Sequence, residues 1–139
     1  MTREFLYEAL RSHRLGVLAS LSETGRPEAA LVGIAVTSGL EIVFDTVTSS
    51  RKYANIRADS RVALVIGWKH EISIQYEGDA RELSAAVADD VYREAYYAVF
   101  PEGRERTAGW AGLTHFVVRP TWIRYSNFNP PAMVEEMRF

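Results

Sequence analysis

Short apolar runs separated by turn residues dominate the chain. Segments of strand length, rich in Val, Ile, Leu and aromatic residues, alternate with clusters that contain Gly, Pro, Ser or Asp. This is the pattern of β-strands joined by turns. It predicts six strands, at residues 15–21, 29–36, 40–46, 61–68, 71–83 and 114–125. The last strand is expected to be interrupted or kinked at Pro120, and residues 127–131 form an extended tail.

Three segments carry apolar residues at helical spacing instead. Residues 2–13 have one apolar stripe with Thr2 as the N-cap. Residues 51–59 form a short helix that begins after Ser49 or Ser50. The longest helix starts at Ser84 and stops before Pro101. The polar, glycine-containing residues 104–112 are predicted to be a connection without regular structure.

The order of elements defines the fold class. A helix is followed by three strands, a helix, two strands, a helix and a final strand. Connections of hairpin type and helices of modest length favour a mainly β protein with some α, an antiparallel β-barrel with flanking helices, over a parallel α/β sheet. The 139 residues contain no internal repeat or linker, so we expect a single domain over residues 1–139.

Composition and charge exclude several function classes. The net charge is −2, with no basic stripe, so nucleic acid is not an expected partner. The chain has no cysteine, which excludes disulfides and thiolate chemistry. No apolar run approaches the roughly 20 residues of a membrane span, and residues 1–5 mix charges as no signal peptide does. A cytoplasmic protein with no membrane partner is expected.

The most informative segment is residues 44–52, where a strand ends and a helix begins. Ser and Thr residues form the turn, and Arg51 and Lys52 stand in the first helical turn. The helix dipole is already positive there, so two adjacent cations indicate an anion that offsets them. A phosphate would accept the free N–H groups, the hydroxyls, the Arg fork and the Lys ammonium. An ordinary surface helix with a serine cap explains these local features equally well.

Other chemistry is not indicated by the residue spacing. The chain has neither a P-loop nor a Gly-x-Gly-x-x-Gly fingerprint. The three histidines are far apart in sequence and lack metal-ligand spacing, so no metal site is expected. No nucleophilic triad is recognisable, and we assign no catalytic residue.

The sequence resembles the pyridoxamine 5'-phosphate oxidase-like family, the FMN-binding split barrels. The resemblance covers nearly the whole chain and rests on the order and spacing of several short motifs. These are Gly16-Val17-Leu18-Ala19-Ser20-Leu21, Gly25-Arg26-Pro27, Phe44-x-Thr46, Ser50-Arg51-Lys52, Asp59-Ser60-Arg61-Val62-Ala63-Leu64 and Glu77-Gly78-x-Ala80. The resemblance implies a six-stranded antiparallel split β-barrel that holds FMN at the interface of a homodimer.

The resemblance also implies roles for individual residues. Arg51 and Lys52, behind Ser50, match the pair that binds the flavin phosphate, and Asp45 and Thr46 match the strand end beside it. The strand that lies along the flavin ring corresponds to Ala30, Leu31 and Val32 and their neighbours up to Ala35. Ser73 stands where the oxidase has a ring-binding glutamine, and Gln75, two residues on, is a substitute on the same strand face.

Departures from the family pattern bear on the activity. Ala35 replaces a family lysine, and the substrate-binding Arg-Leu segment is missing, so oxidation of pyridoxamine phosphate is not expected. The resemblance implies an FMN-dependent oxidoreductase of undefined substrate. The alternatives are a non-catalytic flavin carrier or sensor and a deazaflavin- or haem-binding split barrel. Trp110, Trp122 and Tyr125 are candidates to cover a flavin from the partner subunit, but core or dimer-interface positions are the favoured interpretation.

Overall fold

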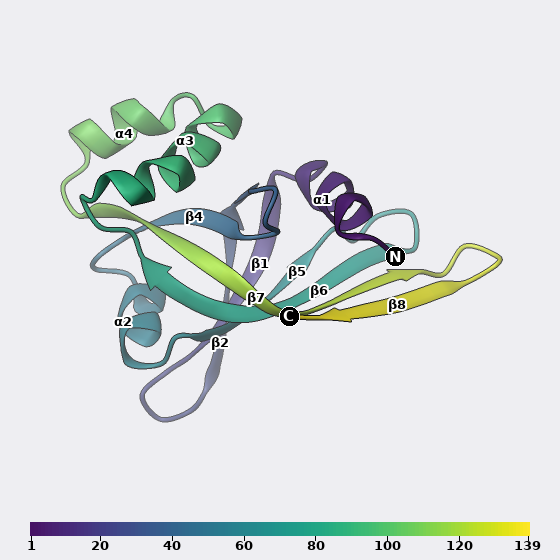
Figure 1. Cartoon of the computed structure of the whole chain (residues 1–139). Coiled ribbons are helices and arrows are strands. Elements are labelled where there is room, and N and C mark those ends of the chain that lie inside the picture. The colour runs from purple at the N-terminus through teal and green to yellow at the C-terminus, as the bar shows by residue number, and fades with distance from the viewer.

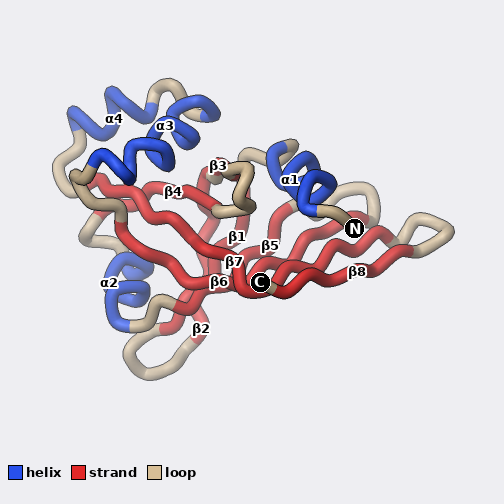
Figure 2. The backbone as a smooth tube through the Cα atoms, in the orientation of Figure 1, coloured by secondary structure: helices blue, strands red, loops and turns tan.

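The computed structural model describes residues 1–139 as one curved antiparallel sheet with helices packed around it (Figure 1, Figure 2). Its elements are α1 (Arg3–Arg11), β1 (Leu15–Leu21), β2 (Pro27–Gly33), β3 (Ala35–Val36), β4 (Ile42–Val47), α2 (Arg51–Ala58), β5 (Arg61–Ile66), β6 (Ile72–Glu82), a 3-10 turn (Val87–Asp89), α3 (Asp90–Val99), α4 (Gly103–Gly109), β7 (Leu113–Asn127) and β8 (Met133–Arg138).

The strand order is β2-β1-β5-β6-β7-β4-β3, with β8 also paired to β7. Strand β7 is long enough to pair with three strands. It pairs with β6 along most of its length, with β4 through its first half and with β8 through its second half. All pairings are antiparallel. The predicted fold class, a mainly β split barrel with flanking helices, is confirmed, although the sheet has eight strands instead of six.

Two differences account for the extra strands. The predicted strand 29–36 breaks at Ile34, because the chain turns from pairing with β1 at Gly33 to pairing with β4 at Ala35. The Ile34 N–H bonds to the carbonyl of Arg14 at this corner. Beyond the predicted tail, Met133–Arg138 forms β8 against β7. Exposure alternates along β8, and its half-buried residues Met133 and Met137 pack against the barrel core.

The predicted irregularity at Pro120 is confirmed as a bulge inside a continuous strand. Glu77 pairs with Trp122, whereas the next residue, Gly78, pairs with Pro120. A Cβ at Gly78 would lie 2.3 Å from the Arg119 carbonyl oxygen, so only glycine fits this crossing.

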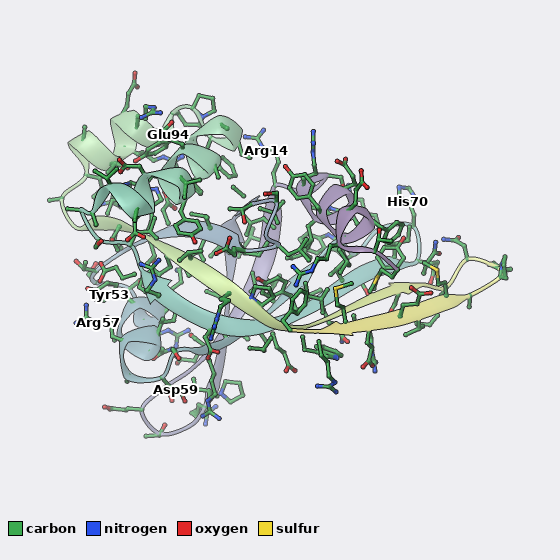
Figure 3. All side chains as sticks on the ribbon, viewed as in Figure 1. Arg14, Tyr53, Arg57, Asp59, His70 and Glu94 are labelled. Atoms are coloured by element: carbon green, nitrogen blue, oxygen red, sulfur yellow. The ribbon has the colours of Figure 1, made fainter.

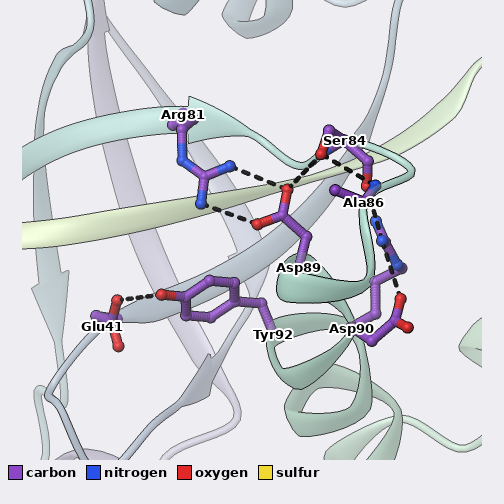
Figure 4. Close-up of polar contacts among 8 residues, drawn as sticks. Glu41, Arg81, Ser84, Ala86, Asp89, Asp90 and Tyr92 are labelled. Atoms are coloured by element: carbon purple, nitrogen blue, oxygen red, sulfur yellow. Dashed lines mark hydrogen bonds and ion pairs between the residues drawn. The ribbon is translucent and has the colours of Figure 1, made fainter.

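The first helix forms as predicted, and the third is shorter than predicted. Thr2 Oγ1 accepts the Phe5 N–H at 3.0 Å, and α1 buries Leu6 and Leu10. The helix expected from Ser84 begins only in the 3-10 turn at Val87, because the Asp89 carboxylate accepts both the Ser84 N–H and its hydroxyl (Figure 4).

The predicted connection 104–112 was wrong in part. Residues Gly103–Gly109 form α4, which packs beside α3 over one end of the sheet (Figure 1). The segment Arg104–Ala108 contains good helix formers, and the contact of Gly103 with Tyr97 fixes its start.

Two hydrophobic clusters hold these layers together. The larger fills the barrel between its inner strand faces, α1 and Ile56 of α2. The smaller lies on the other side of β4 and β7, beneath α3, and consists of Ala35, Val43, Leu83, Tyr96, Tyr97 and Val117. Strand β4 therefore has buried residues on both faces, and successive side chains along it enter different hydrophobic clusters.

Candidate functional site

The turn between β4 and α2 is built by hydroxyl side chains. Thr46 Oγ1 and Ser50 Oγ lie 2.8 Å apart, and Ser50 caps α2 by accepting the Tyr53 N–H at 3.2 Å. The Thr48 N–H bonds to the Gly112 carbonyl at 2.9 Å, which ties the turn to the start of β7. Of the two predicted N-caps, Ser49 and Ser50, the structure uses Ser50, and contacts on both sides hold the turn.

A small cavity of about 110 Å³ opens beside this turn. It lies between α2 and the inner faces of β1 and β2. Its lining residues are Leu18, Ser20, Glu28, Ala29, Ala30, Arg51, Lys52 and Asn55. The structure therefore brings together three predicted site residues, Arg51, Lys52 and Ala30, beside the first turn of α2. The N–H groups of that first turn have no acceptor within the helix.

A carboxylate that was not among the predicted site residues, Glu28, also lies in this cavity. Arg51 Nη1 donates to Glu28 Oε2 at 2.8 Å, and Asn55 Nδ2 donates to Glu28 Oε1 at 2.9 Å. Asn55 also donates to Ser20 Oγ at 3.1 Å. The available signal was the alternation of β2, which places Glu28 on the same face as Ala30.

Asp45 and Thr46 are not on the same face of β4. Thr46 faces the α2 turn, whereas Asp45 faces α3, opposite His115 of β7. Asp45 Oδ2 and His115 Nε2 are buried without hydrogen-bond partners. Of the two residues, only Thr46 directs its side chain towards the cations, so a role for Asp45 there is limited to its backbone.

The cluster beneath α3 perturbs titration. Burial lowers the pKa of His115, which packs edge-on against Tyr96 and Tyr97. Burial also raises the pKa of Tyr96, and the Asp45 charge adds to this shift. Burial of both groups away from water therefore favours the neutral form of each side chain.

The predicted ring-contact residues occupy different faces of the sheet. Ala30 and Val32 face inward on β2, whereas Leu31 faces outward and is 61% exposed. Ser73 and Gln75 also face outward, because Ile74 between them is buried in the barrel. A single chain therefore does not bring Ser73 or Gln75 to the cavity of Arg51 and Lys52.

The outer face that carries Leu31 and Gln75 is apolar on β2, β1 and β5, whereas β6 presents polar side chains there. Cross-strand pairing places Val17 between Leu31 and Val65, with Gln75 beside Val65. A parallel row consists of Ala29, Ala19, Ala63, Glu77 and Trp122. We call these two rows the outer strip. Leu31 and Val65 are both exposed there. Exposed apolar side chains that lie side by side often mark an interaction surface.

The three aromatic candidates separate in the structure. Tyr125 is buried in the barrel core and packs edge-on against Phe5 at 4.9 Å between ring centroids. Trp122 lies in the outer strip, and its Nε1–H donates to Glu136 Oε2 at 3.0 Å. Trp110 follows α4 and is exposed. Tyr125 thus has the predicted core position, and Trp122 is the candidate that pairs across the sheet from β6 on the outer face shared with Gln75.

A second, larger cavity of about 500 Å³ lies at the other end of the barrel. Its lining includes His13, Arg14, Trp68, Lys69 and His70 around an apolar floor of Ile72 and Ile74. Figure 3 shows His70 of this cavity and Tyr53 and Arg57 of α2 at opposite ends of the molecule. The two cavities share no lining residue.

None of the helices combines the length and apolar character needed to cross a bilayer.

No curated protein matches the chain. Among solved structures, a haem-binding protein of Mycobacterium smegmatis superimposes with a TM-score of 0.80 at 15% identity, over 98% of this chain. The present chain covers only 56% of that protein.

Two other solved structures match over almost their whole lengths. General stress protein 26 of Bacillus anthracis has a TM-score of 0.73 at 16% identity, with 100% of both chains covered. An FMN-binding protein of Nostoc punctiforme, related to pyridoxamine 5'-phosphate oxidase, has a TM-score of 0.65 at 13% identity, over 99% of this chain and 92% of its own. At these identities the structures share the fold. The pyridoxamine 5'-phosphate oxidase family model matches residues 2–127. The chain therefore belongs to the pyridoxamine 5'-phosphate oxidase family.

Proposed function

We propose that this protein binds FMN, with the flavin phosphate held at the start of α2, and acts as a flavin-dependent oxidoreductase. The observation that carries the proposal is the convergence of Arg51 and Lys52 on one cavity beside the hydroxyls of Thr46 and Ser50. These are the donors that a phosphate group needs. The Nostoc FMN-binding structure supports the choice of ligand at the level of the fold.

The residues present fit the phosphate end of FMN. Ser50 and Thr46 offer hydroxyls, and the first turn of α2 adds N–H groups and a partial positive charge. No acidic residue stands in that first turn. The Arg51 side chain is 75% exposed, so it has room to change rotamer towards a ligand once it leaves Glu28. The cavity holds a phosphate-sized group, and the remainder of FMN has to lie outside it.

The ring end of the proposed site needs a second copy of the chain. Gln75 and Ser73 project from the outer sheet face, while Ala30, Arg51 and Lys52 line the inner cavity. A flavin that touches both sets must lie between two subunits. The outer strip, with exposed Leu31 and Val65, is an apolar surface suited to such a homodimer.

When bound, FMN supplies the hydride and electron chemistry. The protein's part is to anchor the phosphate through Arg51 and Lys52 and to present Gln75 as a hydrogen-bonding group. Ala35 lies at the β2–β3 corner in contact with the α3 cluster, so no cation from this position meets a substrate phosphate. We therefore propose a substrate other than pyridoxamine phosphate.

Titration of the purified protein with FMN and with riboflavin, followed by flavin fluorescence, tests the proposal. We expect FMN to bind and riboflavin, which lacks the phosphate, to bind much more weakly. Reduction of the bound flavin by NADH or NADPH distinguishes an oxidoreductase from a carrier or sensor. Equal affinity for FMN and riboflavin would rule out the phosphate site.

Haem is the second candidate, and the larger cavity favours it. His13 and His70 offer nitrogens, Arg14 and Lys69 offer cations for carboxylates, and the floor is apolar. Addition of haemin should produce a Soret band shift that His13→Ala or His70→Ala reduces. A shift that survives both substitutions would exclude this cavity. A deazaflavin would compete with FMN at the phosphate site, and competition between the two distinguishes them.

A further inference from the structure

One carboxylate stands inside the proposed phosphate site. Glu28 projects inward from β2, and its side chain is only 21% exposed. Its Oε2 accepts from Arg51 Nη1 at 2.8 Å, and its Oε1 accepts from Asn55 Nδ2 at 2.9 Å. Both carboxylate oxygens therefore contact donors that line the cavity, as the oxygens of a bound anion would.

The position of Glu28 conflicts with a simple anion site. A phosphate that takes the Arg51 guanidinium must lie close to the Glu28 carboxylate, and the two negative charges repel each other. A phosphate that binds Arg51 must therefore draw the guanidinium away from Glu28, which leaves the carboxylate without its paired cation. Asn55 retains contact with Glu28 through an amide, which carries no charge to neutralise it.

We propose that Glu28 is an internal counter-anion of the phosphate site, which occupies the Arg51 guanidinium and is displaced by a ligand phosphate. This inference rests on the proposed function, because it concerns the same cavity. Displacement costs binding free energy, so the site selects ligands whose remaining contacts offset that cost. Free inorganic phosphate is disfavoured, whereas a phosphate carried by a large aromatic group is retained.

A purely structural role makes a different prediction. Glu28 also links β2 to α2 through Asn55, and Ser20 of β1 joins the same chain of hydrogen bonds. If Glu28 acts only as this link, its charge is irrelevant to phosphate affinity. Glu28→Gln separates the two roles, because glutamine retains a carbonyl acceptor and lacks the charge.

The test measures inorganic phosphate binding by NMR, with the backbone amides of Arg51 and Tyr53 as reporters. We expect Glu28→Gln to bind phosphate about tenfold more tightly than the wild type, since a like charge beside the ligand is removed. Glu23→Gln is the matched control, because Glu23 is exposed in the β1–β2 turn and the change in net charge is the same. This control should leave phosphate affinity unchanged.

A second measurement uses the wild type alone. Saturation with phosphate should shift the Glu28 carboxyl carbon resonance as Arg51 releases it. Unchanged phosphate affinity in Glu28→Gln, or an unperturbed Glu28 carbon when phosphate occupies the site, would overturn the inference. If the variant unfolds, the wild-type carbon shift alone decides.

FMN titrations keep the two proposals apart. Tighter phosphate binding by Glu28→Gln, without FMN binding to either protein, would support Glu28 as the counter-anion and remove the flavin assignment. FMN binding with equal affinity in wild type and Glu28→Gln would retain the flavin and remove the role of Glu28. Absence of both phosphate and FMN binding would overturn both.

Discussion

Arg81 of β6 and Asp89, which precedes α3, form a bidentate ion pair in which both nitrogen–oxygen distances are 3.0 Å (Figure 4). The same carboxylate accepts the Ser84 N–H at 2.7 Å. Asp89 is 5% exposed, whereas much of the Arg81 side chain is in solvent. The pair therefore fixes the loop that carries α3 onto the sheet.

Asp89→Asn should lower the free energy of unfolding by about 2–3 kcal/mol, because it weakens several hydrogen bonds to a buried carboxylate. Urea unfolding followed by circular dichroism measures the change. Asp90→Asn is the matched control, since Asp90 contacts Arg93 at the surface. This control should cost less than about 1 kcal/mol. Equal losses in both variants would contradict a special role for Asp89.

The buried His115 should make stability depend on pH. Burial lowers its pKa in the folded state, so the unfolded chain binds a proton first as the pH falls. The free energy of unfolding should therefore decrease below about pH 6.5, the ordinary histidine value. His115→Gln removes this contribution, whereas His70→Gln, on the surface, retains it.

The measurement compares thermal or urea unfolding of the three proteins between pH 5 and 8. Carboxylates titrate in all of them, so the difference between His115→Gln and the wild type isolates the histidine. A pH profile of His115→Gln parallel to that of the wild type would show that His115 has the same pKa in the folded and unfolded states, contrary to this prediction.

Replacing Arg51 and Lys52 together by Ala should weaken FMN binding by roughly a hundredfold or more, because two charge-assisted contacts to the phosphate are lost. Riboflavin binding should be unchanged. Arg104→Ala combined with Lys69→Ala removes the same charge away from the cavity and serves as the control. Fluorescence titration gives both affinities, and circular dichroism verifies the fold.

A charged residue in the outer strip should break the proposed homodimer. Leu31→Asp and Val65→Asp each place a carboxylate in an apolar surface that a partner would desolvate. Sedimentation velocity should show a shift from dimer to monomer. Val87→Asp changes an 83% exposed residue ahead of α3 and should leave the dimer intact. A wild type that sediments as a monomer would exclude this interface.

Local sequence carried most of the information about the elements. The Thr2 and Ser50 caps, the apolar runs of β1 and β5 and the turn at Gly25 are short-range features, and each predicted its element. The order of strands and short connections was sufficient for an antiparallel β-barrel with flanking helices, because antiparallel neighbours need only short turns. The split form of the barrel was implied by the resemblance to the family. Pro120 marked the irregularity in β7 because proline lacks a backbone donor.

The tertiary structure decided how residues distant in sequence meet. Sequence placed Arg51 and Lys52 at a helix start, but only the packing of α2 against β1, the strand paired with β2, brought Glu28 to Arg51. The two faces of β4 lie in different surroundings, so the side chains of the consecutive residues Asp45 and Thr46 lie in different sites.

Gln75 is also separated from the predicted phosphate site. The alternation along β6 predicted that its side chain points away from the core, but not that the phosphate cavity lies on the opposite face of the sheet. Local propensity and alternation determine the element and face of a residue. The curvature of the sheet and the docking of helices determine which charges become neighbours, because these depend on contacts between distant segments.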